Sequence, residues 1–454
     1  MGSKEDFDEL VAELDKNNSS EFLYDNESGI PDFVTAKNGL QREFTNKARI
    51  ALSSLSSTIH LNNKDISSVI EIKTFIGIVR QCIADYHAET SLAEDTSCEY
   101  TELVSRIKLE TSRLSKEYTH YFPAWTLGME KETPFTIGPV TFISREQWID
   151  SVDFPDNAKE KFWNEPEANF KWKEILKDAL NNPSSTTPLV GLANNVYGSI
   201  NKCPSLLKIS LKGYEKGLSR KLAELICKTA LDSVSLAFGD RAFFHQQALY
   251  DERLQPFGSS SLIETNGFLW LPGSSLSDRI PYLDYIRVKN RTEEMSEILD
   301  AFGYMLEALV MPERHAYPKL ANRWATALDW FGEGNREKND AIALAKIVSS
   351  LDILAKAGGY RPILDMFQHL FQISETTEVI KGKNPKTLKK FVENIYGDGR
   401  SKILHGTHYE RLKSFSEQRD KAAYFARIAL IECAIRLKKY TGDDTDNAFR
   451  TIPK

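Results

Sequence analysis

Two residues near the C-terminus, Arg400 and His405, have four residues between them and form an R-x4-H motif. RNA cleavage without a metal needs a group that exchanges protons near neutral pH, which suits histidine. It also needs a permanent cation that holds the phosphate, which suits arginine. The pair supplies both groups, so these residue types indicate a candidate site for phosphodiester chemistry.

The spacing alone is weak evidence, because an arginine and a histidine separated by four to six residues occur in two further places. These are Arg80 with His87 and Arg113 with His120. Both pairs lie within or at the end of long helical patterns, where such side chains are usually solvated or packed. We therefore interpret them as structural.

Helical geometry limits how the motif can work. Five positions of a regular helix turn the side chain about 140° from its start, so Arg400 and His405 do not share one face. A bend or a second subunit is expected to complete the site. Asp398 is a candidate N-cap for a helix whose first turn holds Arg400, which would add backbone N–H groups to a phosphate site.

A basic segment accompanies the motif. Residues 381–402 carry a net charge of +5. Lys389, Lys390 and Lys402 could follow an RNA backbone, although a run of lysines on a helix is equally well a solvated face.

The elements that must position the motif are helices. From residue 312 to 454 the pattern is almost purely helical, with glycines and prolines between segments, and it predicts a helical bundle. In the segment 341–358, apolar residues recur on one stripe that Asp352 flanks. An ion pair of Asp352 with an arginine or lysine is expected, and Arg400 is one candidate that it could orient.

The string GRSKILHGT, with the helices NRWATALDWF and AIALAKIVSSLDILAKAG before it and one long helix after it, resembles the HEPN superfamily. The signature of that family is an arginine, four to six residues, then His-Gly. The resemblance spans about residues 315–440 and is greatest to the ApeA-like and abortive-infection branches found in bacterial antiphage defence. Ser401 differs from the Asn, Asp or His that follows the arginine in many active members.

The resemblance implies a metal-independent endoribonuclease that needs no cofactor. It further implies a homodimer whose two motifs form one composite site on RNA. His405 would assist attack of the 2′-hydroxyl or protonate the leaving oxygen, and Arg400 would stabilise the developing charge. Asp352 stands where such proteins often carry an acidic residue, and we assign it and Ser401 supporting roles.

The N-terminal two thirds, residues 1–311, predicts a mixed α+β region with a small sheet, so the whole chain is expected to be mainly α. Residues 1–35 are acidic and are expected to form a loosely held helix or a docking tail. Residues 41–118 and 205–238 have helical patterns. PFTIGPVTFISREQW predicts a hairpin, and FFHQQALY, SSLIETNGFLWLPG and PYLDYIRV predict strands. This region is expected to sense a phage-derived or protein trigger.

Composition and charge exclude several classes of protein. The chain has 454 residues, 41% of them hydrophobic and 27% charged, as in packed domains. It shows no export signal, lipid anchor or membrane-spanning run, which predicts a cytoplasmic protein. Its five cysteines form no CxxC pair, which argues against a zinc site. The net charge of -6 arises in residues 1–28, so the remainder is nearly neutral.

Two other interpretations of the motif stay open at this stage. The first is a catalytically silent HEPN bundle that binds nucleotides or dimerises within a regulatory protein. The second is a plain helical scaffold in which Arg400 and His405 are surface residues. A structure in which the pair shares a cleft would argue against the scaffold, and only an activity would argue against the silent module.

Overall fold

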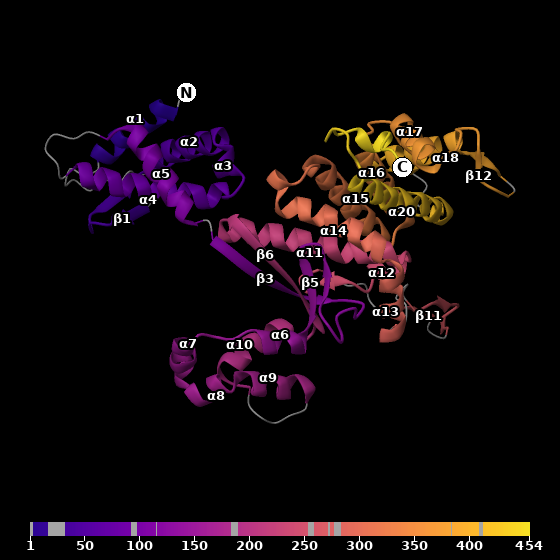
Figure 1. The fold of residues 1–454 in the computed structure, drawn as a ribbon, viewed down its shortest axis with the longest axis horizontal. Coiled ribbons are helices and arrows are strands. Elements are labelled where there is room, and N and C mark those ends of the chain that lie inside the picture. Colours follow the sequence, from indigo (N-terminus) through magenta and orange to yellow (C-terminus); the bar gives the residue numbers. More distant parts are fainter. Residues whose placement is uncertain are drawn as a thin grey trace. The chain divides into compact units, whose positions relative to one another are not determined.

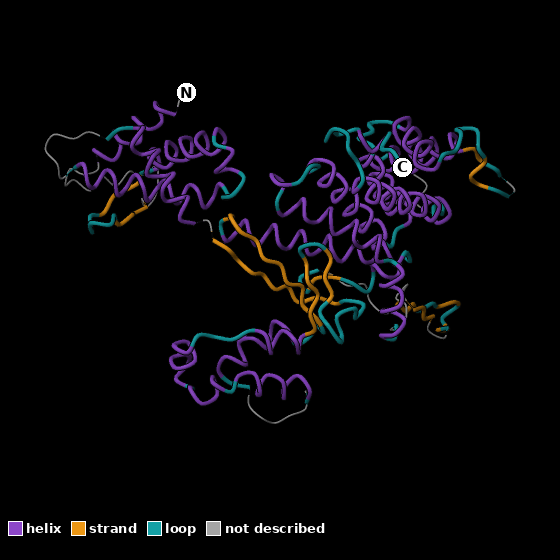
Figure 2. Tube along the Cα trace, viewed as in Figure 1, coloured by secondary structure: helices purple, strands orange, loops and turns teal. Residues whose placement is uncertain are grey.

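The computed structural model describes residues 3–16, 32–91, 98–114, 116–182, 189–252, 258–270, 273–276, 283–382, 384–407 and 412–454. The fold is mainly helical, with a small sheet in the N-terminal half, as the sequence predicts (Figures 1 and 2). Of the acidic tail predicted for residues 1–35, positions 1, 2 and 17–31 lie outside the described residues.

The chain divides into two compact units. The first comprises Met1–Thr119 and Ser210–Ala223, and the second comprises His120–Ile209 and Glu224–Lys454. The division expected from sequence fell at residue 311, but the helices before that point pack in the same unit as the bundle after it. The reason is that α14 (Ser296–Val310) packs against both α15 (Pro318–Arg336) and α20 (Ser416–Lys438).

The first unit is a helical layer with one short hairpin. Its elements are α1 (Ser3–Lys16), β1 (Asp32–Thr35), β2 (Gln41–Phe44), α2 (Asn46–Asn62), α3 (Lys64–Ser67), α4 (Ile72–Thr90) and α5 (Tyr100–Leu114). The helix α1 is not loosely held, contrary to the expectation. Phe7, Leu10 and Leu14 are all at most 2% exposed and belong to the same core as Phe44 and Phe75.

The sheet has the strand order β4–β5–β6–β3–β7. Its strands are β3 (Lys116–Trp125), β4 (Phe135–Ile137), β5 (Val140–Ser144), β6 (Ser205–Tyr214) and β7 (Ala248–Leu249). The predicted hairpin is present, with Ile137 paired to Val140 across its turn. Two separate small ladders follow, β8 (Gly258–Ser261) with β11 (Gly273–Leu276) and β9 (Glu264–Thr265) with β10 (Phe268–Leu269).

Several predicted segments have another type of structure than expected, as two examples show. Residues 205–214 were expected to be helical but form β6, in which buried Leu207, Ile209 and Leu211 alternate with exposed lysines and a serine. PYLDYIRV was expected to be a strand; Pro281 and Tyr282 lie outside the described residues, and its second half begins the helix α13 (Tyr285–Glu294), because Asp284 accepts a hydrogen bond from the Arg287 N–H and caps it.

A small helical lobe lies between β5 and β6 in the sequence, and its core around Trp172 includes Ile143 of β5 and Leu206 of β6. Its helices are α6 (Arg145–Ser151), α7 (Asp156–Lys161), α8 (Pro166–Phe170), α9 (Trp172–Asn181) and α10 (Gly191–Ile200), with the 3-10 turn η1 (Phe162–Asn164). After β6 follow α11 (Lys216–Phe238) and α12 (Arg241–Phe244).

The C-terminal segment forms the predicted helical bundle (Figure 1). Its further elements are η2 (Pro312–Arg314), α16 (Asp340–Leu354), α17 (Tyr360–Phe371), β12 (Glu378–Ile380), β13 (Lys386–Thr387), α18 (Leu388–Asn394), η3 (Ile395–Ser401), α19 (Lys402–Leu404) and η4 (Ala448–Arg450). The buried indole of Trp324 donates to the Leu430 carbonyl at 2.8 Å and ties α15 to α20. No helix of the described residues is long and apolar enough to cross a bilayer.

Candidate active site

The motif lies on one continuous helical rod made of α18, η3 and α19. The rod begins at Leu388, after Thr387, whose hydroxyl accepts from the Lys390 N–H. Asp398 is therefore not an N-cap, contrary to the expectation, because it lies ten residues inside the rod. It pairs with Lys402 at 2.8 Å, and this hydrogen bond lowers the pKa of Asp398.

The middle of the rod, Ile395–Ser401, is a π-helix. Each turn there is wider than an α-turn, and such segments occur often at functional sites. Gly399 allows this part of the rod to press against α16, since a Cβ atom at Gly399 would lie 2.7 Å from Leu344 Cδ2. The π segment ends at Ser401, and the chain continues from there without a break through α19 to His405.

The guanidinium of Arg400 is held by three neighbours. Its Nη2 lies 2.6 Å from Asp352 Oδ2, its Nε donates to Ser349 Oγ at 3.3 Å, and its Nη1 donates to Tyr396 Oη at 3.3 Å. The Tyr396 ring also lies under the guanidinium, 5.3 Å from centroid to Cζ. The side chain remains 24% exposed, so the cation is fixed in direction and still reachable from solvent.

Asp352 is itself fixed. Its Oδ1 accepts from the Gly358 N–H at 2.9 Å, just beyond the end of α16, while Oδ2 faces Arg400. The predicted ion pair between Asp352 and Arg400 is thus present. The carboxylate is thus held on both oxygens, and together with Ser349 and Tyr396 it fixes the direction of the guanidinium.

His405 ends the rod. Its N–H donates to the Ser401 carbonyl at 3.0 Å, and its side chain is exposed. Gly406 follows with φ +67°, and the N–H groups of Gly406 and Thr407 return to the carbonyls of Ile403 and Lys402. This is a Schellman cap, which explains the glycine after the histidine: a left-handed residue must stand there.

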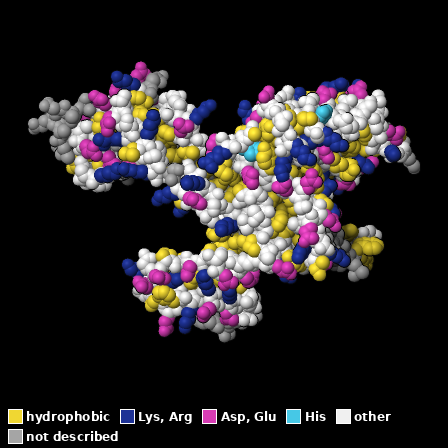
Figure 3. Space-filling model, viewed as in Figure 1, with side chains coloured by type: hydrophobic (Ala, Val, Ile, Leu, Met, Phe, Trp, Pro, Cys, Tyr) yellow, Lys and Arg dark blue, Asp and Glu magenta, His cyan; other side chains and the backbone are white. Residues whose placement is uncertain are grey.

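The lysines predicted to contact RNA each have an acidic neighbour. Lys389 lies 3.9 Å from Glu375, Lys390 lies 3.7 Å from Glu393, and Lys402 pairs with Asp398. Exposed pairs of this kind contribute little, about 0–1 kcal/mol, so a polyanion can compete for the lysines. On the face shown in Figure 3, basic and acidic side chains are interspersed.

Ser401, predicted to support the site, is half-buried and contributes its backbone carbonyl to the His405 turn.

Two residues of the site, Ser349 and Tyr396, were not predicted from the sequence. Burial, and after it the charge of Asp352, raises the pKa of the Tyr396 hydroxyl, which therefore stays protonated at neutral pH. Tyr396 stands one helical turn before Arg400, and this i,i+4 spacing could have revealed it.

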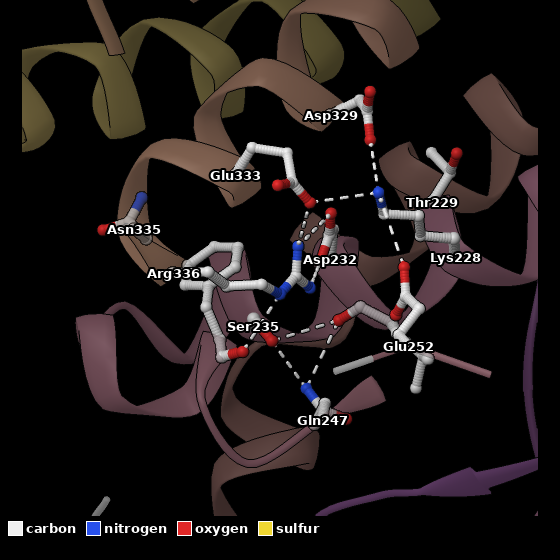
Figure 4. Close-up of polar contacts among 12 residues, drawn as sticks. Lys228, Thr229, Asp232, Ser235, Gln247, Glu252, Asp329, Glu333, Asn335 and Arg336 are labelled. Atoms are coloured by element: carbon white, nitrogen blue, oxygen red, sulfur yellow. Dashed lines mark hydrogen bonds and ion pairs between the residues drawn. The ribbon is translucent and has the colours of Figure 1, made fainter. Parts of the chain in front are cut away.

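A second polar cluster lies between α11 and α15 (Figure 4). Asp232, 1% exposed, forms a two-point ion pair with Arg336, and Lys228 lies 3.0 Å from Asp329 and 3.1 Å from Glu333. Its charged groups satisfy one another, and they join helices that are far apart in the sequence. We assign this cluster a structural role.

Comparison of the chain with family models, curated proteins and solved structures gave no significant match. Within the described ranges, no three His, Cys, Asp or Glu side chains gather as they would to hold a metal ion.

Proposed function

We propose that this protein is a metal-independent endoribonuclease, a cytoplasmic effector of bacterial antiphage defence, with Arg400 and His405 as its catalytic pair. The observation that carries the proposal is the contrast between the two side chains. Arg400 is held in a fixed direction by Asp352, Ser349 and Tyr396, whereas the His405 imidazole is exposed at the end of the same rod.

The cation has donors left for a phosphate. A guanidinium has five N–H groups, and the three contacts of Arg400 within the described residues use one on each nitrogen. The second N–H of Nη1 and of Nη2 can bind two oxygens of one phosphate. Asp352 fixes this orientation before RNA binds, so little conformational freedom is lost on binding.

In the proposed reaction the RNA 2′-oxygen attacks the adjacent phosphorus while the bond to the 5′-oxygen breaks. One imidazole takes the proton from the 2′-hydroxyl or gives a proton to the leaving 5′-oxygen, and Arg400 stabilises the negative charge on the phosphoryl oxygens. The products are a 2′,3′-cyclic phosphate and a 5′-hydroxyl. No water is consumed in this step.

Two acid–base roles call for two imidazoles, and a homodimer would supply the second. Large apolar side chains stand exposed around the motif along the chain, namely Leu404 at 53%, Leu412 at 101% and Tyr424 at 59%. A dimer contact would remove these side chains from water, as interaction surfaces do. We propose that they contribute to a dimer contact, and that residues 1–311 respond to a phage-derived or protein trigger.

The test is cleavage of total RNA by the purified protein in EDTA. The wild type is expected to cut, and both Arg400→Ala and His405→Ala to lose cleavage. Arg113→Ala and His120→Ala are the matched controls, since they remove the same residue types at a similar spacing elsewhere in the chain. Products are checked for a 2′,3′-cyclic phosphate end.

Loss of cleavage in all four variants would point to a general defect and not to the motif. If the wild type cuts no RNA and its expression does not arrest growth, the proposal is contradicted and an alternative function is favoured. That alternative is a catalytically silent HEPN module for nucleotide binding or dimerisation. The Asp352–Arg400 pair favours it, because a salt bridge that joins α16 to η3 can serve stability alone.

A further inference from the structure

A pocket of about 470 Å³ opens beside α14, far along the chain from the R-x4-H motif. Four segments of the second unit line it: the β4 hairpin, the end of α13, one face of α14, and the last turn of α20. The lining residues are Phe135, Thr136, Ile137, Gly138, Thr292, Glu293, Ser296, Leu299, Asp300, Gly303, Tyr304, Glu307 and Lys438.

The long wall of the pocket is one face of a helix. The α14 residues that line it recur at intervals of three and four from Ser296 to Glu307, which places them in one row about 16 Å long. Two glycines close one side, since a Cβ atom at Gly303 would lie 2.8 Å from the Gly138 backbone nitrogen. The hairpin turn therefore rests directly on the helix, and the pocket is an elongated trough.

Three acidic side chains line this trough. Asp300 and Glu307 are seven residues apart on α14, or about 10 Å along that helix, and Glu293 lines the trough from the end of α13. Glu293 and Glu307 are exposed and have no ion-pair partner among the described residues. Asp300 pairs with Lys438, so the trough already holds one primary alkylammonium group on its central carboxylate.

The floor between the carboxylates is apolar and aromatic. Leu299 and Ile137 are buried, and the rings of Phe135 and Tyr304 face the same space. Aromatic faces attract ammonium groups, and aliphatic side chains pack against the methylenes between them. Carboxylates at intervals over an apolar floor complement a chain of methylenes that carries positive charges at intervals.

We propose that this trough binds a linear polyamine, with its terminal ammonium groups at Glu293 and Glu307 and its methylenes on Leu299 and Phe135. This site is separate from the R-x4-H motif, and the proposal does not depend on RNA cleavage. An organic polycation of this class would be selected over a metal ion of equal charge, because a metal ion gains nothing from the apolar floor.

The experiment is isothermal titration of the full-length protein with spermine at low ionic strength, with magnesium chloride as a second probe. We expect spermine to bind saturably. Magnesium, added at the same total concentration of positive charge, should not displace it. The double variant Glu293→Gln/Glu307→Gln should bind about tenfold more weakly, as the loss of two ion pairs implies.

Two further variants separate the trough from general charge effects. Glu378→Gln/Glu417→Gln removes the same charge from exposed positions outside the pocket and should leave the affinity unchanged within about twofold. Ser296→Trp keeps every carboxylate but fills the trough, and it should weaken binding as strongly as the double variant. Absence of saturable binding, or equal weakening by the two double variants, would overturn the proposal.

Discussion

Two histidines that follow an arginine at similar spacing, His87 in the first unit and His405 in the second, have opposite surroundings. His87 is 2% exposed and both its ring nitrogens are engaged: Nδ1 accepts from Arg42 Nε at 2.8 Å and Nε2 lies 2.9 Å from Asp15. The His405 side chain is exposed, and the described residues offer it no hydrogen-bond partner. The structural interpretation of His87 fits these contacts.

The difference in burial separates a structural role of histidine from a possible role in proton transfer. A histidine whose nitrogens are both bound in the interior holds α4 to α1 and β2, and it has no lone pair or proton to offer a substrate. An exposed histidine beside a fixed arginine contributes little to folding but can exchange protons. Substitutions in a buried network whose polar groups bind one another should therefore reduce stability. Substitutions at the exposed R-x4-H motif should reduce activity.

The largest effect on stability is expected in the buried cluster of Asp232 and Arg336. Asp232→Ala leaves the Arg336 guanidinium charged, largely buried and without its main partner. Breaking one side of a buried ion pair costs about 3–5 kcal/mol of unfolding free energy. This loss is measured by urea unfolding. The control is Asp329→Ala: Asp329 is half exposed at the edge of the same cluster, and its loss should cost less than about 1 kcal/mol. Equal losses in both variants would contradict the structural role of Asp232.

At the open motif, His405→Ala should lower the rate of RNA cleavage by about 100-fold or more, the usual contribution of a general acid or base. Its free energy of unfolding should change by less than about 0.5 kcal/mol, as expected for a surface position. Single-turnover cleavage and urea unfolding are measured on the same preparation. A loss of activity that merely follows a loss of stability would make His405 structural like His87.

Asp352→Asn tests the residue that orients Arg400. The amide keeps the shape and can still accept from the Gly358 N–H, but it removes the charge that holds the guanidinium. We expect RNA cleavage to fall by about tenfold, less than with loss of His405, because Ser349 and Tyr396 still hold the arginine. Asp365→Asn, in an exposed pair with Arg361, is the matched control and should cut normally.

The smallest expected effect is on the pH dependence of the free energy of unfolding. Burial lowers the pKa of His87 below its ordinary value of 6.5, although the hydrogen bond that His87 donates to Asp15 acts in the opposite direction. The unfolded chain thus binds this proton more readily, so stability is full above pH 6.5 and falls as the pH drops below it. Urea unfolding at pH 7.5 and 5.5 should show a smaller change in the His87→Asn variant than in the wild type. An identical pH dependence in both proteins would disprove this assignment.

The sequence predicted the helical bundle well because its helices have caps, breaks and apolar stripes of their own. It also predicted the pairing of Asp352 with Arg400, since a charged residue at the edge of an apolar stripe needs a partner. All of β6 was wrongly predicted as helical, because Leu206 and Leu207 fit either a helix or a strand and the alternation becomes evident only from Lys208 onward.

The π segment and the contacts of Tyr396 could not be predicted in the same way. They depend on how closely the rod approaches α16 at Gly399, which is a matter of tertiary packing and not of local propensity. Likewise Asp398 has a typical N-cap residue type, but the helix had already begun at Leu388. Local preference was overridden there by the longer run of helix-forming residues before it.

A π-helical turn amounts to one extra residue inserted into an α-helical rod. Deleting a single residue between Ile395 and Gly399 would restore the regular α-helix and rotate everything after it by about 100° relative to α16. Leu388, Phe391 and Val392 would keep their places in the core, but Arg400 would turn away from Asp352. The alignment of the motif is thus set by the number of residues in the rod as much as by their identity.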